Sequence, residues 1–346
     1  MTFRDIRAQA LAVTTLERAV ARDRVASAYL FEGPSGTGKT LTALALAEAL
    51  LCTTDPGKGC GNCAVCTRIR ERQHPDVRVF SPREEGAGNI PVEFVREEIL
   101  PFTRYAPFEG KAAFVIFPSA EVSFPAAHPE AANAILKTLE EPKAGLHFVL
   151  ASERPDRLLT TIRSRCQRLA FEKLPATDLD AILEARGIEA RVREAVIPLA
   201  DGSADLALQL TEGENPARFL ELAFRVDDAL HHAGPGTLIS LADELAKDGE
   251  LDLVLQTLGL VYRDIACVGL DAAETDLHFP GERANLEPRA ERLSPGEAAD
   301  RAARFRRVLE LRDRNANLEL GLDSLLLEIG GSRIHAAGAR TGGARP

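Results

Sequence analysis

Two hydrophobic patterns divide the chain into an N-terminal and a C-terminal part. Up to about residue 170, short apolar runs alternate with segments of helical periodicity, a pattern typical of βα units around a parallel sheet. The predicted strands include SAYLFEG (27–33), KAAFVIFPSAEV (111–122) and LHFVLAS (146–152), and the predicted helices include LTALALAEALLC (41–52) and HPEAANAILKTLEEP (128–142). We therefore expect an α/β fold, a parallel sheet with flanking helices, over residues 1–171.

From residue 172 onward only helical periodicity remains. Residues 172–214 are predicted to form a small lid of short helices, which ends near the polar break TEGENP. Residues 215–330 are predicted to form an all-helical domain, with apolar faces over 217–232 and 251–270 and two more helices over 299–329. The last residues, 331–346, are rich in Gly, Ala and Arg, and we expect a disordered tail.

The segment GPSGTGKT, residues 33–40, follows the first predicted strand and precedes a predicted helix. Gly33, Gly38, Lys39 and Thr40 match the phosphate-loop pattern G-x-x-x-x-G-K-[ST], and Gly36 is a further glycine of this loop. In such a loop the backbone N–H groups close around phosphate oxygens, Lys39 reaches the outer phosphates and Thr40 offers its hydroxyl to Mg²⁺. We expect a site for ATP or ADP with Mg²⁺; the alternative is a chance glycine turn.

Hydrolysis requires more than this loop. A later strand has to end in an Asp that holds Mg²⁺, beside an acid that orients the attacking water. The candidate strand, residues 111–122, carries Pro118 and Ser119 where these acids are expected, and Glu121 lies beyond them. We therefore expect that the loop binds nucleotide without turnover, unless DVRVF (76–80) or HFVLAS (147–152) is the relevant strand.

Four cysteines follow the predicted phosphate-loop helix: Cys52, Cys60, Cys63 and Cys66. Their close spacing suits one metal ion better than two disulfides, and four thiolates without an open position are typical of structural zinc. The C-x₂-C-x₂-C run is also compatible with an iron–sulfur cluster, and unligated cysteines are the third alternative. We expect a zinc module over about residues 52–66, inserted after the helix.

Arginines crowd the segment PDRLLTTIRSRCQRL, residues 155–169. Arg163, Arg165 and Arg168 lie near the end of the α/β part. A guanidinium there can reach the phosphates of another molecule, and an arginine supplied in trans accelerates phosphoryl transfer by several orders of magnitude. The alternative is a solvated basic surface.

Taken together, GPSGTGKT, the four cysteines, AANAILKTLEEP and TIRSRC resemble the clamp-loader branch of the AAA+ ATPases, over residues 1 to about 330. The resemblance implies an AAA+ domain, a helical lid and a helical collar that holds a five-membered ring together. It also implies that Arg165 is an arginine finger for a neighbouring subunit's ATP site, and that Ser152 is the polar sensor residue of its strand. For the collar, the alternative is an ordinary helical core without a partner.

The chain departs from the active members of this family at two places. They carry an Asp-Glu pair where this chain has Pro118 and Ser119, and an arginine where Asp205 stands in DGSADLAL. The resemblance therefore implies a non-hydrolysing, stationary subunit of the DNA polymerase III clamp loader. Its implied partners are gamma/tau and delta subunits, the sliding clamp, and primer–template DNA held by the assembled complex. The alternatives are an active, gamma/tau-like ATPase motor of the same loader and a zinc-dependent regulatory module unrelated to replication.

Composition limits how the chain reaches these partners. The 346 residues have a formal net charge of -10, so the isolated chain lacks the excess of Lys and Arg that binds nucleic acid. No apolar run reaches the ~18 residues of a membrane span, and the N-terminus lacks a signal profile. We expect a cytoplasmic protein that does not contact membranes.

Overall fold

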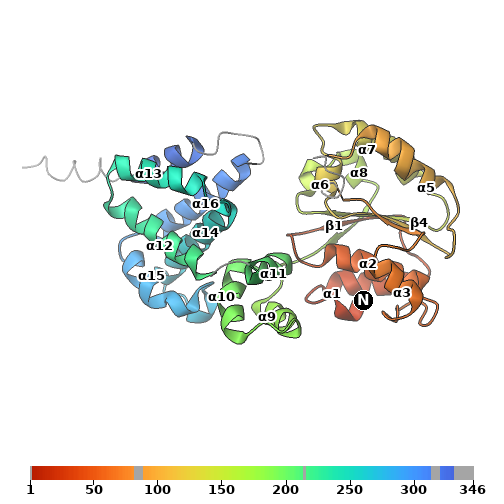
Figure 1. Ribbon diagram of the computed structural model, residues 1–346, viewed down its shortest axis with the longest axis horizontal. Helices are drawn as coiled ribbons and strands as arrows, with labels where there is room; N and C mark the ends of the chain where they lie inside the picture. The colour runs from red at the N-terminus through yellow and green to blue at the C-terminus, as the bar shows by residue number, and fades with distance from the viewer. Residues whose placement is uncertain (1, 82–88, 213–215, 313–319, 331–346) are drawn as a thin grey trace, which may run out of the picture. The chain divides into compact units, whose positions relative to one another are not determined.

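The computed structural model of the chain describes residues 2–81, 89–212, 216–312 and 320–330. The chain divides into two compact units (Figure 1). Unit 1 comprises Met1–Gly187 and Ala200–Leu208, and unit 2 comprises Ile188–Leu199 and Gln209–Pro346. The predicted domain limits stay predictions. The predicted tail and residues 213–215 at the second limit lie outside the described residues.

Unit 1 contains a five-stranded parallel sheet with the strand order β2-β3-β4-β1-β5. The strands are β1 (Ala28–Glu32), β2 (Val77–Val79), β3 (Ala113–Phe117), β4 (Leu146–Ser152) and β5 (Gln167–Ala170). Strands β1, β3 and β4 lie inside the sheet and are almost entirely buried, which explains why they appear in the sequence as continuous apolar runs. The predicted α/β fold with a parallel sheet is confirmed.

Helices cover both faces of this sheet (Figure 1). Because successive strand residues point to opposite faces, Tyr29 and Phe31 pack into one core and Leu30 into the other. The core around Tyr29 includes residues of α1 (Ala10–Ala21), α2 (Lys39–Leu51) and α3 (Ala64–Arg70). The opposite core includes residues of a π-helical turn (Val95–Ile99), α6 (Ala120–Ser123), α7 (Pro129–Glu140) and α8 (Thr160–Arg163).

Short elements complete unit 1. They are 3₁₀ turns at Phe3–Asp5 and Pro155–Arg157, α4 (Val92–Phe94), α5 (Leu100–Arg104), α9 (Ala176–Ala185) and the beginning of α11 (Ala204–Glu212).

Two elements of unit 1 differ from those predicted from the sequence. The strand predicted within 111–122 ends at Phe117, before Glu121 as expected, but α6 follows it, a short helix that was not predicted. The arginine-rich segment contains an unpredicted strand, β5. Because β5 lies at the sheet edge, Leu169 is its only buried residue.

Unit 2 is helical, as predicted. Its helices are α10 (Ala190–Ala200), α12 (Ala217–His232), α13 (Pro235–Ala246), α14 (Leu251–Val268), α15 (Arg283–Ala290), α16 (Pro295–Arg312) and a helix over 320–330, with 3₁₀ turns at Glu274–Asp276 and Pro280–Glu282. Helix α14 is buried along most of its length and packs against α12, α15 and α16. Among the described residues, no helix combines the length and the apolar character that a bilayer crossing requires.

A charged network is buried between these helices. The carboxylate of Asp227 accepts hydrogen bonds from Tyr262 Oη at 2.7 Å and Arg289 Nε at 3.1 Å. His231 Nε2 and Arg301 Nη1 lie 3.5 and 3.6 Å from Asp227 Oδ1. Burial alone would raise the pKa of Asp227, but hydrogen bonds from His231 and Tyr262 and the charge of Arg289 outweigh burial and lower it. This network is held by α12, α14, α15 and α16 together.

Candidate functional site

The phosphate-loop segment lies between β1 and α2, in the setting that the sequence predicted. The backbone N–H of Gly33 donates to the carbonyl of Ser152 at 3.1 Å, which fixes the start of the loop to the end of β4. Ser152 is buried, and its hydroxyl accepts the backbone N–H of Arg154 at 3.2 Å. Ser152 and the loop segment 33–40 therefore lie side by side, because the neighbouring parallel strands β1 and β4 end at the same edge of the sheet.

Residues 203–205 pack directly against the loop, within unit 1. The N–H of Ala204 donates to the carbonyl of Gly36 at 3.0 Å. Gly36 has φ +65°, and a Cβ atom there would lie 2.2 Å from Ser203 Oγ and 2.7 Å from the backbone N of Asp205. Only glycine satisfies both the backbone conformation and this close approach.

Lys39 is buried, and its ammonium group donates to the carbonyl oxygens of Gly33, at 2.8 Å, and Pro34. Burial lowers the pKa of Lys39, and three carboxylates oppose this shift through their negative charge: those of Glu153, Glu121 and Asp205. The negative charges of three carboxylates of the same chain therefore act on the loop lysine, and like charges of this kind also repel a phosphate.

The end of β3 carries Pro118 and Ser119, as the sequence indicated. The carbonyl of Ser119 accepts two backbone N–H groups in the first turn of α6. This turn directs Glu121 back toward β4, where its Oε1 accepts the N–H of Glu153 at 3.2 Å. Its Oε2 is buried and has no hydrogen-bond partner among the residues that the structure describes. Sequence spacing alone placed Glu121 beyond the site, because it could not predict a turn directly after Phe117.

The three arginines of the sequence analysis have different surroundings. Arg168, on β5, forms a two-pronged ion pair with Glu32 at 2.6 and 2.7 Å. Arg163 donates to Thr160 Oγ1 at 3.3 Å, and its buried Nε has no partner among the described residues.

Arg165 follows α8 and remains 32% exposed in its side chain. Its Nη1 donates to the carbonyl of Thr161 at 2.7 Å, and its Nη2 forms an ion pair with Glu140 Oε1, at the end of α7. Glu140 was not singled out from the sequence, because glutamate at the end of a helix gives no signal for a partner 25 residues away.

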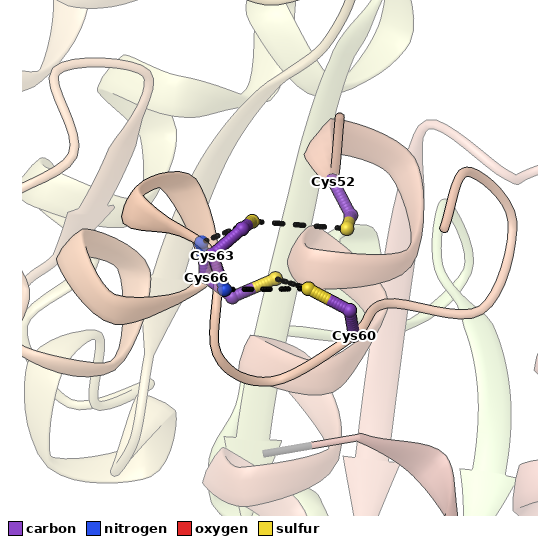
Figure 2. A group of neighbouring side chains, drawn as sticks. All are labelled: Cys52, Cys60, Cys63 and Cys66. Atoms are coloured by element: carbon purple, nitrogen blue, oxygen red, sulfur yellow. Dashed lines mark hydrogen bonds between the residues drawn. The ribbon is translucent and has the colours of Figure 1, made fainter. Parts of the chain in front are cut away.

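The four cysteines converge at one point (Figure 2). Cys52 directly follows α2, Cys60 lies in the connecting loop, and Cys63 and Cys66 lie at the start of α3. All four sulfur atoms lie within 4.8 Å of one another. The Sγ atoms of Cys52 and Cys63 are 3.9 Å apart and those of Cys60 and Cys66 are 4.0 Å apart. A tetrahedral zinc ion with Zn–S bonds of about 2.3 Å requires sulfur separations of about 3.8 Å, so the cluster fits such an ion.

The backbone supports negative charge on these sulfurs. N–H groups of Asp55 and Cys63 point at Cys52 Sγ and Cys60 Sγ, each at 3.3 Å, and that of Cys66 points at Cys63 Sγ at 3.5 Å. Burial would raise the pKa of Cys63, but the N–H of Cys66 and the neighbouring thiols lower it to about 6. Burial instead raises the pKa of Cys66, the most deeply placed of these thiols. Four converging sulfur atoms, with backbone N–H groups directed at three of them, are able to hold a metal ion.

Comparisons with known proteins agree with this architecture. A family model described as "DNA polymerase III, delta subunit" matches residues 8–175. DNA polymerase III subunit delta' of Bacillus subtilis is 28% identical over 257 residues, which cover 73% of this chain and 75% of that protein. Subunit delta' of Escherichia coli is 34% identical over 191 residues, 54% of this chain and 55% of that protein.

Subunit tau of Salmonella typhimurium is 30% identical over 321 residues, which cover 86% of this chain. The matched part is 48% of the tau protein, so the chain spans about half the length of this relative. Similarity therefore extends both to delta' subunits and to the tau type.

Proposed function

Because the chain belongs to the clamp-loader family of DNA polymerase III subunits, we propose that it is a delta'-like, stationary member of the loader. In this function it does not hydrolyse ATP itself. It lends Arg165 to the ATP site of a neighbouring ATPase subunit, and so assists the ATP-driven loading of a sliding clamp on primed DNA.

The observation that carries this proposal is the end of β3. Its last residue, Phe117, is followed by Pro118 and Ser119, neither of which can hold Mg²⁺ as a carboxylate or accept a proton from water at neutral pH. Asp205 supports the same conclusion, because it places a negative charge near Lys39 where a cation would favour the γ-phosphate. The phosphate loop is then retained for nucleotide binding or for its packing against residues 203–205.

The proposed partners follow from the family. They are gamma/tau-type and delta-type subunits, the clamp, and primer–template DNA. The formal net charge of -10 favours DNA contact through the assembled complex over binding by the single chain. For the four-cysteine cluster we propose structural zinc, since four sulfur ligands leave no open position for chemistry.

The first test is steady-state ATP turnover by the purified chain with Mg²⁺. We expect no turnover above that of Lys39→Ala, which removes the ammonium group of the phosphate loop. Turnover that disappears with Lys39→Ala would contradict the stationary function, because a carboxylate of this chain would then have to complete the site.

A second test addresses the arginine finger in the assembled loader. Arginine fingers accelerate phosphoryl transfer by about 10³- to 10⁵-fold at the site they serve, so Arg165→Ala should lower the DNA-stimulated ATPase of the complex by about 10-fold or more. Arg168→Ala is the matched comparison, because it removes an equal charge from the same arginine-rich segment, and Arg168 uses both Nε and Nη2 in its pair with Glu32, whereas the Nε of Arg165 is unpaired among the described residues. An unchanged rate with Arg165→Ala would remove the finger assignment.

One observation favours a second candidate, an active motor subunit of the tau type. Glu121 lies close enough to Lys39 to affect its pKa, and its buried Oε2 lacks a hydrogen-bond partner among the described residues. A carboxylate in this position could take over the function of the missing acids. In that case the purified chain turns over ATP, and Glu121→Gln and Lys39→Ala each abolish the turnover.

A further inference from the structure

Glu140 is the last residue of α7, and its carboxylate pairs with the guanidinium of Arg165. The two residues come from different elements, and Thr161 in α8 supplies a second contact through its carbonyl oxygen, 2.7 Å from Arg165 Nη1. Arg165 Nη1 also lies 3.5 Å from the hydroxyl oxygen of Ser164, so both terminal nitrogens of the guanidinium are held by acceptors. The Nε–H of Arg165 has no partner among the described residues, and a third of the side chain stays exposed at 32%.

We propose that Glu140 is a positioning residue for Arg165. It fixes the guanidinium against α7 and α8, so that the remaining N–H groups point outward to the phosphates of a neighbouring subunit's nucleotide. This inference rests on the proposed finger function of Arg165, and it adds a residue through which that function acts.

The physical reason is preorganisation. An arginine side chain has several rotatable bonds, and an exposed one samples many rotamers unless contacts select one. An arginine that stabilises charge in a transition state acts best when it is oriented before the reaction begins. A planar guanidinium held at two nitrogen atoms keeps a fixed plane, which matches the bidentate geometry of phosphate recognition.

Fold stability is a weaker explanation for the same pair. The side chains of Arg165 and Glu140 are 32% and 46% exposed, and ion pairs with this exposure contribute little to folding. Removing the Glu140 carboxylate should therefore leave the fold intact. We expect its effect on the rate of ATP hydrolysis by the assembled loader.

Glu141 provides a matched control. It is the neighbouring acid and is exposed. Its backbone N–H caps α7 by donating to the carbonyl of Lys137, but its carboxylate has no hydrogen-bond or ion-pair partner among the residues that the structure describes. Glu140→Ala and Glu141→Ala change the net charge of the chain equally, so a difference between them isolates the contact with Arg165. Glu140→Gln keeps an oxygen that can accept from Arg165 Nη2 and removes only the charge.

The experiment measures kcat and KM for ATP of the assembled loader in the presence of primed DNA. Since a misplacement of 1 Å can cost about 10²-fold, we expect Glu140→Ala to lower kcat by about 3- to 10-fold with KM nearly unchanged. Glu140→Gln should recover most of the lost rate, and Glu141→Ala should match the wild type. A wild-type kcat in Glu140→Ala, or an equal loss in Glu141→Ala, would overturn the proposal.

A double-mutant cycle separates this inference from the finger assignment. If Glu140 acts through Arg165, then Glu140→Ala has no further effect in the Arg165→Ala background. If Arg165→Ala itself leaves the rate unchanged, the finger assignment fails and the positioning function fails with it. If Arg165→Ala lowers the rate and Glu140→Ala does not, only the positioning function is wrong.

Discussion

Asp227 illustrates how much a single residue can depend on its surroundings. It lies in the middle of the apolar stripe of α12, fully buried, and reaches elements far along the chain through Tyr262, Arg289 and Arg301. The sequence predicted the apolar stripe and not this network, because periodicity says which face is buried and nothing about the partners of a charge on it. Such a charge is tolerated only when it is paired.

Asp227→Asn should therefore destabilise unit 2 strongly. It leaves the cationic Arg289 and Arg301 in the interior without their shared counter-charge, which costs about 3 kcal/mol or more. Chemical denaturation followed by circular dichroism measures this free energy of unfolding. The matched control is Asp228→Asn, because the Asp228 side chain is 51% exposed and also pairs with Arg289. If the two variants lost equal amounts of unfolding free energy, the buried network around Asp227 would not be the cause of the destabilisation.

The same residue predicts a pH dependence. Because the pKa of Asp227 in the folded state lies below the ordinary value of 3.8, its contribution to stability is fully present above that value and is lost as the pH falls through the lower folded-state pKa. The stability difference between the wild type and Asp227→Asn should be constant between about pH 7 and pH 5 and shrink toward about pH 2. A stability difference that grows on acidification would contradict the lowered pKa of Asp227 in the folded state.

At the scale of elements, the sequence predicted those whose patterns are local. Strand β1, the phosphate loop and helix α2 appear where the apolar run and the glycine motif place them. Strand β5 was missed, since an edge strand with one buried residue, Leu169, carries too few apolar side chains to form a pattern. The surroundings of Lys39 could not be predicted either, because Glu121 approaches it through the turn of α6, which spacing does not reveal.

The cysteine cluster joins two elements, α2 and α3, through four side chains. Structural zinc contributes directly to folding. We therefore expect Cys63→Ser to unfold the segment between these helices and to lower the melting temperature of the chain by several degrees. Removal of the metal with a strong chelator should have the same effect. Metal analysis should find about one zinc per wild-type chain and much less in Cys63→Ser. Cys267→Ser is the control, because Cys267 lies in α14, outside the cluster. A metal-free wild type with an unchanged melting temperature would contradict the zinc site.

At the scale of the whole molecule, unit 1 is discontinuous along the chain. Residues 200–208 belong to it, although residues 188–199 before them belong to unit 2. This returning segment supplies Ala204, which bonds to Gly36, and Asp201, which forms an ion pair with Lys173.

A fragment of residues 1–187 should consequently be less stable than a fragment of residues 1–212. We expect its melting temperature to be lower by at least about 3 °C, because the phosphate loop loses the packing of residues 203–205, and a loss of 1 kcal/mol shifts a unit of this size by about 2–4 °C. Equal melting temperatures would indicate that the returning segment contributes nothing to the folding of unit 1.

The discontinuity of unit 1 also has a consequence during synthesis on the ribosome. Domains generally fold as their residues emerge, starting from the N-terminus. The five strands all lie before residue 171, so the sheet is complete well before the segment that covers Gly36 has been made. That segment is synthesised only after residues 188–199, which belong to unit 2 and pack with residues that are synthesised later. The phosphate loop is therefore among the first parts of the chain to be translated and among the last parts of its unit to be enclosed.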